Sequence, residues 1–142
     1  NGEGVGFGIL ATATLGNAAI TNTTASYTDS DGNAGATATI ASVAASLTAG
    51  SVVPFQLAAG DKGVGSIQSV TLGTSYVSGS LSIVAFRRIA YIPVPLANTG
   101  QQAMFDGNPG VRLFDGSCLH LWQLPTATTA TTVQGVLTTA ER

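Results

Sequence analysis

Apolar and polar residues alternate with a period of two along most of the chain, which is typical of β-strands and not of helices. The segment 36–47 (ATATIASVAASL) shows this pattern clearly. Its β-branched residues at alternate positions favour a strand, although alanine is frequent in it. The Asp, Ser, Gly and Asn residues at 29–33 are typical of a turn, and the Thr- and Ala-rich segment 18–28 precedes them. We therefore expect a β-hairpin built from these three segments.

Other short apolar segments, bounded by Gly and Pro, predict further strands. Pro54 lies in one of them and has no backbone N–H, so we expect an edge strand or the start of a strand there. The longest apolar segment, 81–92, has apolar residues at both odd and even positions. We expect it to be buried on both faces, or to face the core on one side and an interface on the other. The further strands that we expect are 9–15, 51–57, 66–72, 81–92, 111–114, 118–124 and 133–139.

Short strands joined by Gly-rich turns predict an all-β fold, a single antiparallel β-sandwich or jelly-roll-like domain. Residues 1–8 (NGEGVGFG) alternate Gly with other residues and lack the side chains to pack alone, so we expect a flexible Gly-rich N-terminal arm. We assign residues 1–16 to an extended arm or first strand and residues 17–142 to the β-sandwich domain. Because Asn1 is not an initiator Met, we expect a processed or partial chain.

The chain is poor in ionised groups. Its 142 residues include five Lys and Arg and seven Asp and Glu, which is 8% of the chain, against roughly 25% in ordinary soluble domains. So few cations do not suffice to hold a nucleic-acid backbone, and no apolar run reaches the about 18 residues of a membrane span. Surfaces of Ser, Thr, Asn and Gln are buried against a partner at little cost. We therefore expect much of the surface to be interface in an assembly, with a hydrated, monomeric secreted β domain as the alternative.

Cys118 and His120, the single Cys and single His, are the candidates for nucleophilic chemistry. On a strand, residues two apart lie about 7 Å from each other, which hinders contact between thiol and imidazole. We therefore expect no catalytic residue, cofactor or metal in this protein, and a structural role for the segment. Leu119 and Leu121 would enter the core. His120 and Trp122 would contact a subunit or partner, because Trp is enriched at interface centres.

The turn at 29–33 leaves an alternative open. Asp29-x-Asp31-Gly-Asn is similar to the start of a calcium-binding loop, although the further ligands of that loop are missing from the chain. A hairpin turn accounts for the same residues through local hydrogen bonds.

Arg87 and Arg88 interrupt the most apolar segment, and adjacent residues of a strand point to opposite faces. Both guanidinium groups are hydrated at the strand end, or one forms an ion pair with Asp106, Asp115 or a partner carboxylate. The candidate interface residues are Arg87, Arg88, Tyr91, His120 and Trp122.

The central segments 47–57 (LTAGSVVPFQL), 66–72 (SIQSVTL) and 79–87 (GSLSIVAFR), together with 125–139, resemble small β-rich virion proteins of tailed bacteriophages. Such proteins decorate or cement the head shell, often as trimers, and others form fibres. The resemblance implies a non-enzymatic role at the capsid surface and transfers no functional residue.

We therefore expect a capsid decoration (cement) protein, a homotrimer that contacts a major capsid protein and binds neither nucleic acid nor membrane. A fibre, spike or carbohydrate-binding receptor module is the second hypothesis, with Trp122, Tyr91, Tyr76 and Tyr27 as its exposed aromatic residues. A small hydrolase would need a reactive Cys118 or His120. A subunit of an extracellular filament has a similar composition and is a further alternative.

Overall fold

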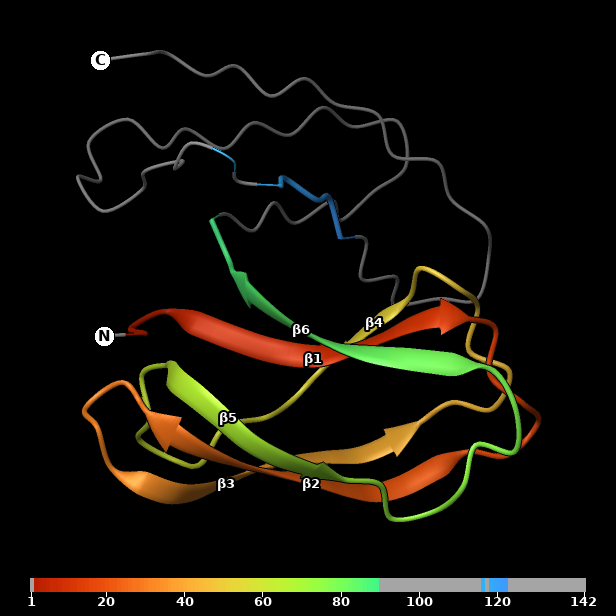
Figure 1. The fold of residues 1–142 in the computed structure, drawn as a ribbon, viewed down its shortest axis with the longest axis horizontal. Helices are drawn as coiled ribbons and strands as arrows, with labels where there is room; N and C mark the ends of the chain where they lie inside the picture. The colour runs from red at the N-terminus through yellow and green to blue at the C-terminus, as the bar shows by residue number, and fades with distance from the viewer. Residues whose placement is uncertain (1, 90–115, 117, 123–142) are drawn as a thin grey trace, which may run out of the picture. The chain divides into compact units, whose positions relative to one another are not determined.

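The structure is a computed structural model that describes residues 2–89, 116 and 118–122 (Figure 1). The chain divides into two units, Asn1–Met104 and Phe105–Arg142. All the strands described below belong to the first unit, so the expectation of one β-sandwich from residue 17 to residue 142 stays a prediction beyond residue 89. The described residues contain no helix with the length and hydropathy that a membrane span requires.

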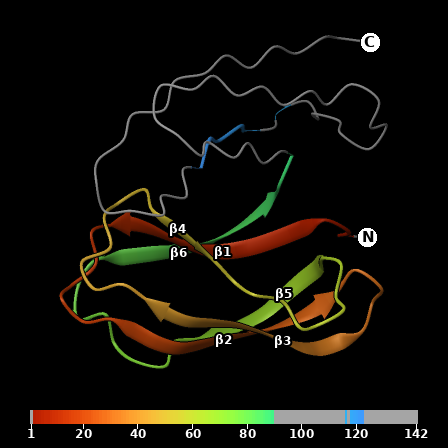
Figure 2. The ribbon, with the colours of Figure 1, turned by 180° about the vertical axis from the view of Figure 1, so that it is seen from behind.

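Within the described residues, six strands form two three-stranded sheets that face each other (Figures 1 and 2). One sheet has the order β4-β1-β6, the other has the order β3-β2-β5, and every neighbouring pair is antiparallel. This confirms the all-β fold and the antiparallel sandwich. A jelly roll needs more strands than the described residues form, and that topology stays a prediction. The strands are β1 (Val5–Ala13), β2 (Ile20–Asp29), β3 (Ala34–Val43), β4 (Val52–Pro54), β5 (Val64–Thr71) and β6 (Ser80–Arg87).

The hairpin expected between residues 18 and 47 is confirmed as β2 and β3, joined by the turn at 30–33. Ala25 of β2 pairs with Ala38 of β3, and both side chains are buried in the core. The side chains that point away from the core on β2 and β3 are mostly Thr and Ser. The alternation of the sequence therefore separates the core face of this sheet from its outer face.

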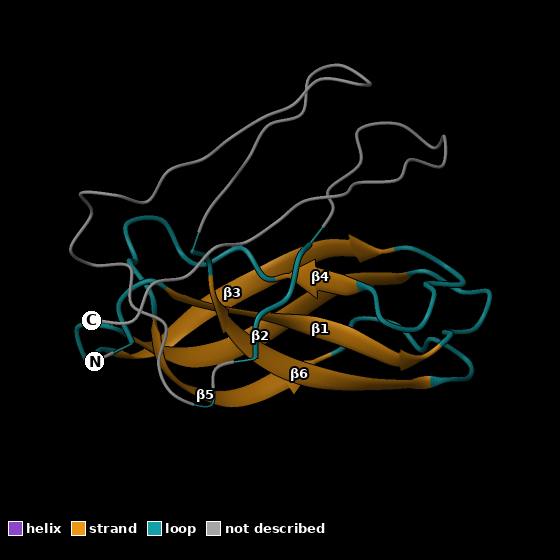
Figure 3. Cartoon of the chain, turned by 90° about the horizontal axis from the view of Figure 1, so that it is seen from above, coloured by secondary structure: helices purple, strands orange, loops and turns teal. Residues whose placement is uncertain are grey.

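The two sheets are linked on one side. Pro54 lies in the edge strand β4, as its missing N–H predicts, and pairs with Gly8. Two residues later Gln56 has crossed to the other sheet, where it exchanges both backbone hydrogen bonds with Thr39 of β3 at 2.9 Å. On the opposite side, β5 and β6 are the outermost strands of their sheets (Figure 3).

The Gly-rich start of the chain is not a free arm. Residues 5–13 form β1, the central strand of its sheet, and Phe7 is fully buried. The glycines allow neighbours to approach: a Cβ on Gly8 would lie 2.7 Å from the carbonyl oxygen of Val53, and one on Gly6 would lie 3.1 Å from the ring of Phe86. The small residues that suggested a lack of packing partners thus make room for a backbone and an aromatic ring.

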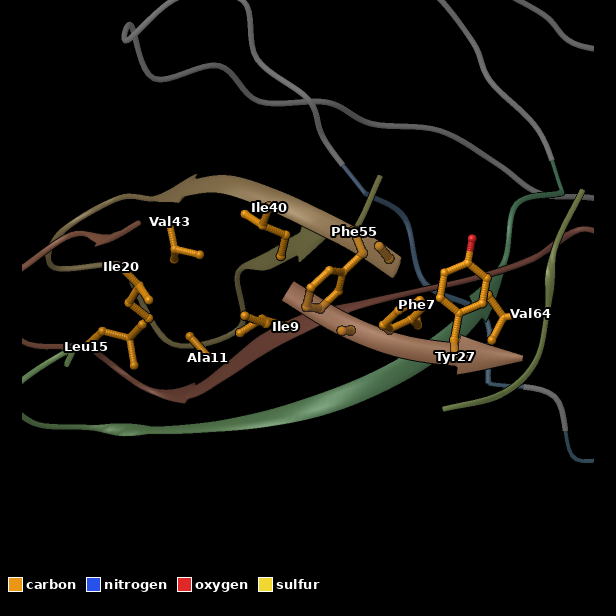
Figure 4. Close-up of a cluster of buried hydrophobic side chains, with 12 residues drawn as sticks. Phe7, Ile9, Ala11, Leu15, Ile20, Tyr27, Ile40, Val43, Phe55 and Val64 are labelled. Atoms are coloured by element: carbon orange, nitrogen blue, oxygen red, sulfur yellow. The ribbon is translucent and has the colours of Figure 1, made fainter. Parts of the chain in front are cut away.

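The core lies between the two sheets (Figure 4). Phe7 stacks on Phe55, with ring centroids 4.6 Å apart, and meets Tyr27 in a tilted arrangement at 6.0 Å. Aromatic pairs at these separations add to the free energy gained by burial of their area. The other buried apolar residues are Ile9, Ala11, Leu15, Ile20, Ala25, Ala38, Ile40, Val43 and Val64.

The apolar segment 81–92 is only partly described, as β6 to residue 87. Leu81 and Ile83 pack against the core, whereas Val84 and Phe86 on the other face are half-buried. β6 is therefore not a strand buried fully on both faces. The strands expected at 111–114 and 133–139 lie outside the described residues.

Candidate functional site

The charged side chains of the first unit lie at one end of the sandwich, on the left in Figure 1. β1 and β5 begin at this charged end, and β2 and β6 finish there. The opposite end of the sandwich is formed by three loops, residues 14–19, 44–51 and 72–79. These loops contain no Asp, Glu, Lys, Arg or His, and we call this end of the sandwich the uncharged end. The charged end holds Glu3, Asp29, Asp31, Asp61, Lys62, Arg87 and Arg88.

Asp29 organises the β2–β3 turn. Its carboxylate accepts hydrogen bonds from the backbone N–H of Asp31 at 2.9 Å and of Asn33 at 2.8 Å, and from Nδ2 of Asn33 at 2.8 Å. These bonds, that of the Asn33 side chain foremost, lower the pKa of Asp29 below its usual value of 3.8. The carboxylate of Asp29 is thus surrounded by N–H donors, as a hairpin turn requires. Within the described residues, no group of three His, Cys, Asp or Glu side chains is placed to hold a metal ion.

Tyr27 links the sandwich core to the loop at 55–63. Its ring is fully buried, its hydroxyl donates a hydrogen bond to Asp61, and it accepts one from the backbone N–H of Ala58 at 3.0 Å. Burial, and then the hydrogen bond to Asp61, raise the pKa of Tyr27 above 10.0. Tyr27 is therefore a core residue, and its assignment to an exposed carbohydrate-binding surface is wrong.

Arg87 and Arg88 are both exposed at the end of β6. Nη2 of Arg87 donates a hydrogen bond to the backbone carbonyl of Glu3 at 2.9 Å. The structure thus gives Arg87 a role in holding the first residues of the chain to the end of β6. Ion pairs with Asp106 or Asp115, and any contact of Tyr91, concern residues outside the described part of the chain.

The three loops of the uncharged end are joined by backbone hydrogen bonds. Leu15 N–H donates to the carbonyl of Leu47 at 3.0 Å, Ser46 N–H to that of Gly16 at 2.7 Å, and Gly16 N–H to that of Ser78 at 2.9 Å. Gly16 of the first loop therefore connects the second loop to the third. The surface that these loops form is fixed by the backbone and not by ionised side chains.

Val77 lies in the third loop and, among the described residues of the first unit, is the most exposed large apolar side chain, at 69%. Its φ is 68°, a left-handed conformation that is rare for a β-branched residue. Ser78 N–H donates to the carbonyl of Tyr76 at 2.8 Å across Val77, which defines a γ-turn of the strained kind. Val77 N–H donates to Oγ of Ser75 at 3.1 Å. The loop thus holds an apolar side chain toward solvent in an unfavourable backbone conformation.

In the second unit, the segment 118–122 differs from the expectation. These residues form no strand, and Sγ of Cys118 lies 3.3 Å from Nε2 of His120, within hydrogen-bond distance. The predicted separation depended on a regular strand, which the described segment does not form. A thiol beside an imidazole is one component of a nucleophilic site. Among the described residues, no acid or amide contacts the imidazole to orient it.

Leu119 and Leu121 were expected in the core, but their side chains are 45% and 77% exposed. Trp122 is 37% exposed, so both leucines are more exposed than the Trp that was expected at the interface. The assignment of the leucines to a buried face is therefore wrong for the described segment. Contact of His120 and Trp122 with a partner stays a prediction.

Of the candidate interface residues, Arg87 and Arg88 belong to the first unit, and His120 and Trp122 belong to the second. Of the aromatic residues proposed for a carbohydrate surface, Tyr76 is half-buried in the first unit. Comparisons of the chain with protein-family models, with curated proteins and with solved structures found no match.

The sequence interpretation missed both the separation of the charges and the exposed Val77. The separation of the charges has a signal in the sequence, because turns with charged residues alternate along the chain with turns without them. The charged turns include 29–33 and 60–63, and the uncharged turns include 44–51 and 72–79. Because the chain reverses direction between successive strands, whether they pair in one sheet or lie in different sheets, alternate connections lie at the same end of an antiparallel sandwich.

Proposed function

We propose that this chain is a non-enzymatic virion structural protein that decorates and cements the capsid shell of a tailed bacteriophage through oligomeric protein–protein contacts. The observation that supports this most is the lack of charge on the sandwich faces. Asp29 and Arg87, each at the end of its strand, are the only ionised residues within β1 to β6. The strand faces can therefore be covered by protein without desolvation of a charge.

The outer face of sheet β3-β2-β5 is suited to the contact with the shell. Hydroxyl side chains form rows across its strands: Thr24 pairs with Thr39 on one side and with Thr71 on the other. In the next row Ser26 pairs with Thr37 and Ser69. A hydroxyl both donates and accepts hydrogen bonds, and a β-branched side chain loses little conformational freedom on burial. We assign the capsid-facing role to this hydroxyl face.

The cementing action follows from burial. A shell filled with DNA is strained at its subunit joints, and a protein that spans a joint adds area that must be exposed before the subunits separate. At roughly 25 cal/mol per Å² of apolar area, a few hundred Å² per contact stabilises a joint by several kcal/mol before association costs. Repetition of the contact over the shell adds avidity. The partners are further copies of this chain, as a homotrimer, and a major capsid protein at the virion surface.

The test uses virions of the phage that encodes the chain, prepared with and without it. We expect particles without the chain to release DNA at a lower temperature, measured with a dye that reports free DNA, and added purified chain to restore the wild-type value. Thr37→Asp places a charge on the hydroxyl face and should not restore it, whereas Thr37→Ser keeps the hydroxyl and should. Equal heat resistance of particles with and without the chain would refute the cement function.

A further inference from the structure

We infer that the uncharged end is the surface through which copies of this chain contact one another, with Val77 as its exposed apolar contact. The inference rests on the separation of charge between the two ends and on the strained conformation of Val77, neither of which the capsid contact needs. The inference rests on the proposed function in one respect, because that function also requires copies of this chain to associate. It adds the surface through which they do so.

Charge decides which end can be buried. The charged end carries four carboxylates and three cations within a few loops, and removing such groups from water is costly unless each finds a partner. The uncharged end offers backbone, Ser and Thr hydroxyls, Asn17 and apolar side chains. Copies that meet at their uncharged ends therefore keep all the described charges of the sandwich hydrated.

Val77 gives the surface an anchor. Strained backbone persists where the surroundings impose it, and such positions concentrate at sites of binding. Gly, Asn or Asp at position 77 would adopt a φ of 68° with less strain and would be better hydrated at 69% exposure. The chain instead holds Val there, which is unfavourable for the isolated subunit in both conformation and exposure. Contact of the Val77 side chain with protein removes its exposure to water.

The surface is also rigid before contact. Backbone hydrogen bonds join the three loops, and Oγ1 of Thr74 donates to the carbonyl of Ala19 at 3.0 Å while it accepts from Thr21 N–H at 3.0 Å. A surface that is ordered in advance loses little conformational entropy on association. Apart from Leu15, which is buried in the core, the three loops comprise 21 residues, which falls in the range of roughly 20–30 residues per side found in stable interfaces.

A second copy fits this surface because the surface is complementary to itself. Its hydroxyls serve as donors on one copy and as acceptors on the other, and no like charges are brought together. A partner with a strongly charged surface could form no ion pair with the uncharged end. If the partner is instead an unrelated uncharged protein, the purified chain will not associate with itself in the test below.

The experiment measures the mass of the purified full chain by sedimentation equilibrium and by light scattering, from about 1 to 100 µM. We compare wild type with Val77→Asp, Val77→Asn and Thr37→Asp. We expect wild type and Thr37→Asp to associate alike, and the two Val77 variants to bind at least about tenfold more weakly. Because Asp and Asn tolerate the backbone conformation at position 77, thermal unfolding at the lowest concentration should show no loss of stability in either variant.

Three results would overturn the inference: wild type that stays monomeric over the whole range, Val77 variants that associate as wild type does, or a loss of association by Thr37→Asp equal to that by Val77→Asp. The first would show that copies do not associate, and the other two that the contact lies elsewhere. The heat test on virions is independent of all three, so a chain that cements shells as a monomer would retain the cementing role, while the homotrimer of the proposed function and this inference would both fail.

Discussion

At the charged end of the sandwich, side chains hold the loops in place: the carboxylate of Asp29 fixes the β2–β3 turn, Tyr27 binds Asp61, and Arg87 binds the carbonyl of Glu3. At the uncharged end the loops are joined mainly by their own backbones, and the glycines allow these backbones to approach closely. Both ends have backbone hydrogen bonds between loops, but groups that titrate contribute hydrogen bonds only at the charged end, and those described at the uncharged end involve backbone and hydroxyl groups.

This difference separates two tasks within one small domain. Side-chain hydrogen bonds to ionised groups are strong but need water or a full set of partners around the charge. Backbone hydrogen bonds between loops leave a neutral surface behind them. The end that is held by backbone is thus the end that can be buried against another protein, and the pH dependence of the fold should arise at the other end.

The largest effect is expected at the uncharged end from Gly73→Ala. A Cβ at this position would overlap the backbone carbonyl of Thr21 and lie 2.8 Å from that of Asn22, neither of which is a movable side chain. We expect a loss of about 3 kcal/mol in the free energy of unfolding, measured by urea denaturation. Gly50→Ala is the control: its φ is 88° but the space around it is open, so we expect a loss of about 1 kcal/mol. Equal losses would mean that close approach does not hold this end together.

A smaller effect is expected at the charged end from Tyr27→Phe. The change removes the hydroxyl that donates a hydrogen bond to Asp61 and accepts one from the N–H of Ala58. We therefore expect a loss of about 1.5 kcal/mol in the free energy of unfolding at pH 7. The pKa of Tyr27 is raised, so the wild type holds this contribution below pH 10.0 and loses it as the pH rises through the folded-state value. The stabilities of wild type and variant should therefore converge above pH 10.0, as urea denaturation across that range will show.

Tyr76→Phe at the uncharged end serves as the control for the Tyr27→Phe variant. A difference that persists unchanged at high pH would show that the hydroxyl acts by packing alone.

The smallest effect is expected from Asp29→Asn, and its size depends on pH. The pKa of Asp29 is lowered by its hydrogen bonds, so its contribution to stability is present above pH 3.8 and disappears as the pH falls through the folded-state value. We expect a lower melting temperature than wild type at pH 7 and a gap that narrows below pH 3.8. Asp31→Asn removes an equal charge from the same turn without removing the acceptor, and should melt as wild type does. A gap that is constant with pH would exclude the hydrogen-bonded carboxylate as its cause.

Local patterns predicted the parts of the fold that depend on neighbours in sequence. The β2–β3 hairpin followed from a period of two and a turn cluster, and the edge position of Pro54 followed from its missing N–H. A strand was expected at 9–15, but the start of β1 at Val5 was hidden, because the room left by Gly6 is filled by Phe86, about eighty residues away. A local pattern does not contain that partner.

The candidate surfaces were less predictable for the same reason. The conformation of Val77 opposes the preference of its residue type, so the surrounding loops impose it and no propensity predicts it. Cys118 and His120 approach each other in a segment that forms no strand, which the alternation of the segment did not suggest. The separation of charges was present in the sequence, but it becomes visible only when alternate turns are assigned to the same end.

The position of β1 has a consequence for how the chain folds as it is made. β1 is synthesised first, yet it lies between β4 and β6, and Val5 pairs with Arg87. The β2–β3 hairpin can form as soon as it emerges from the ribosome, whereas β1 gains β4 as a neighbour later and its second neighbour only when β6 has been translated. During that interval the sheet that holds Phe7 and Ile9 is incomplete, and the nascent chain exposes apolar side chains and an unpaired strand edge that favour aggregation.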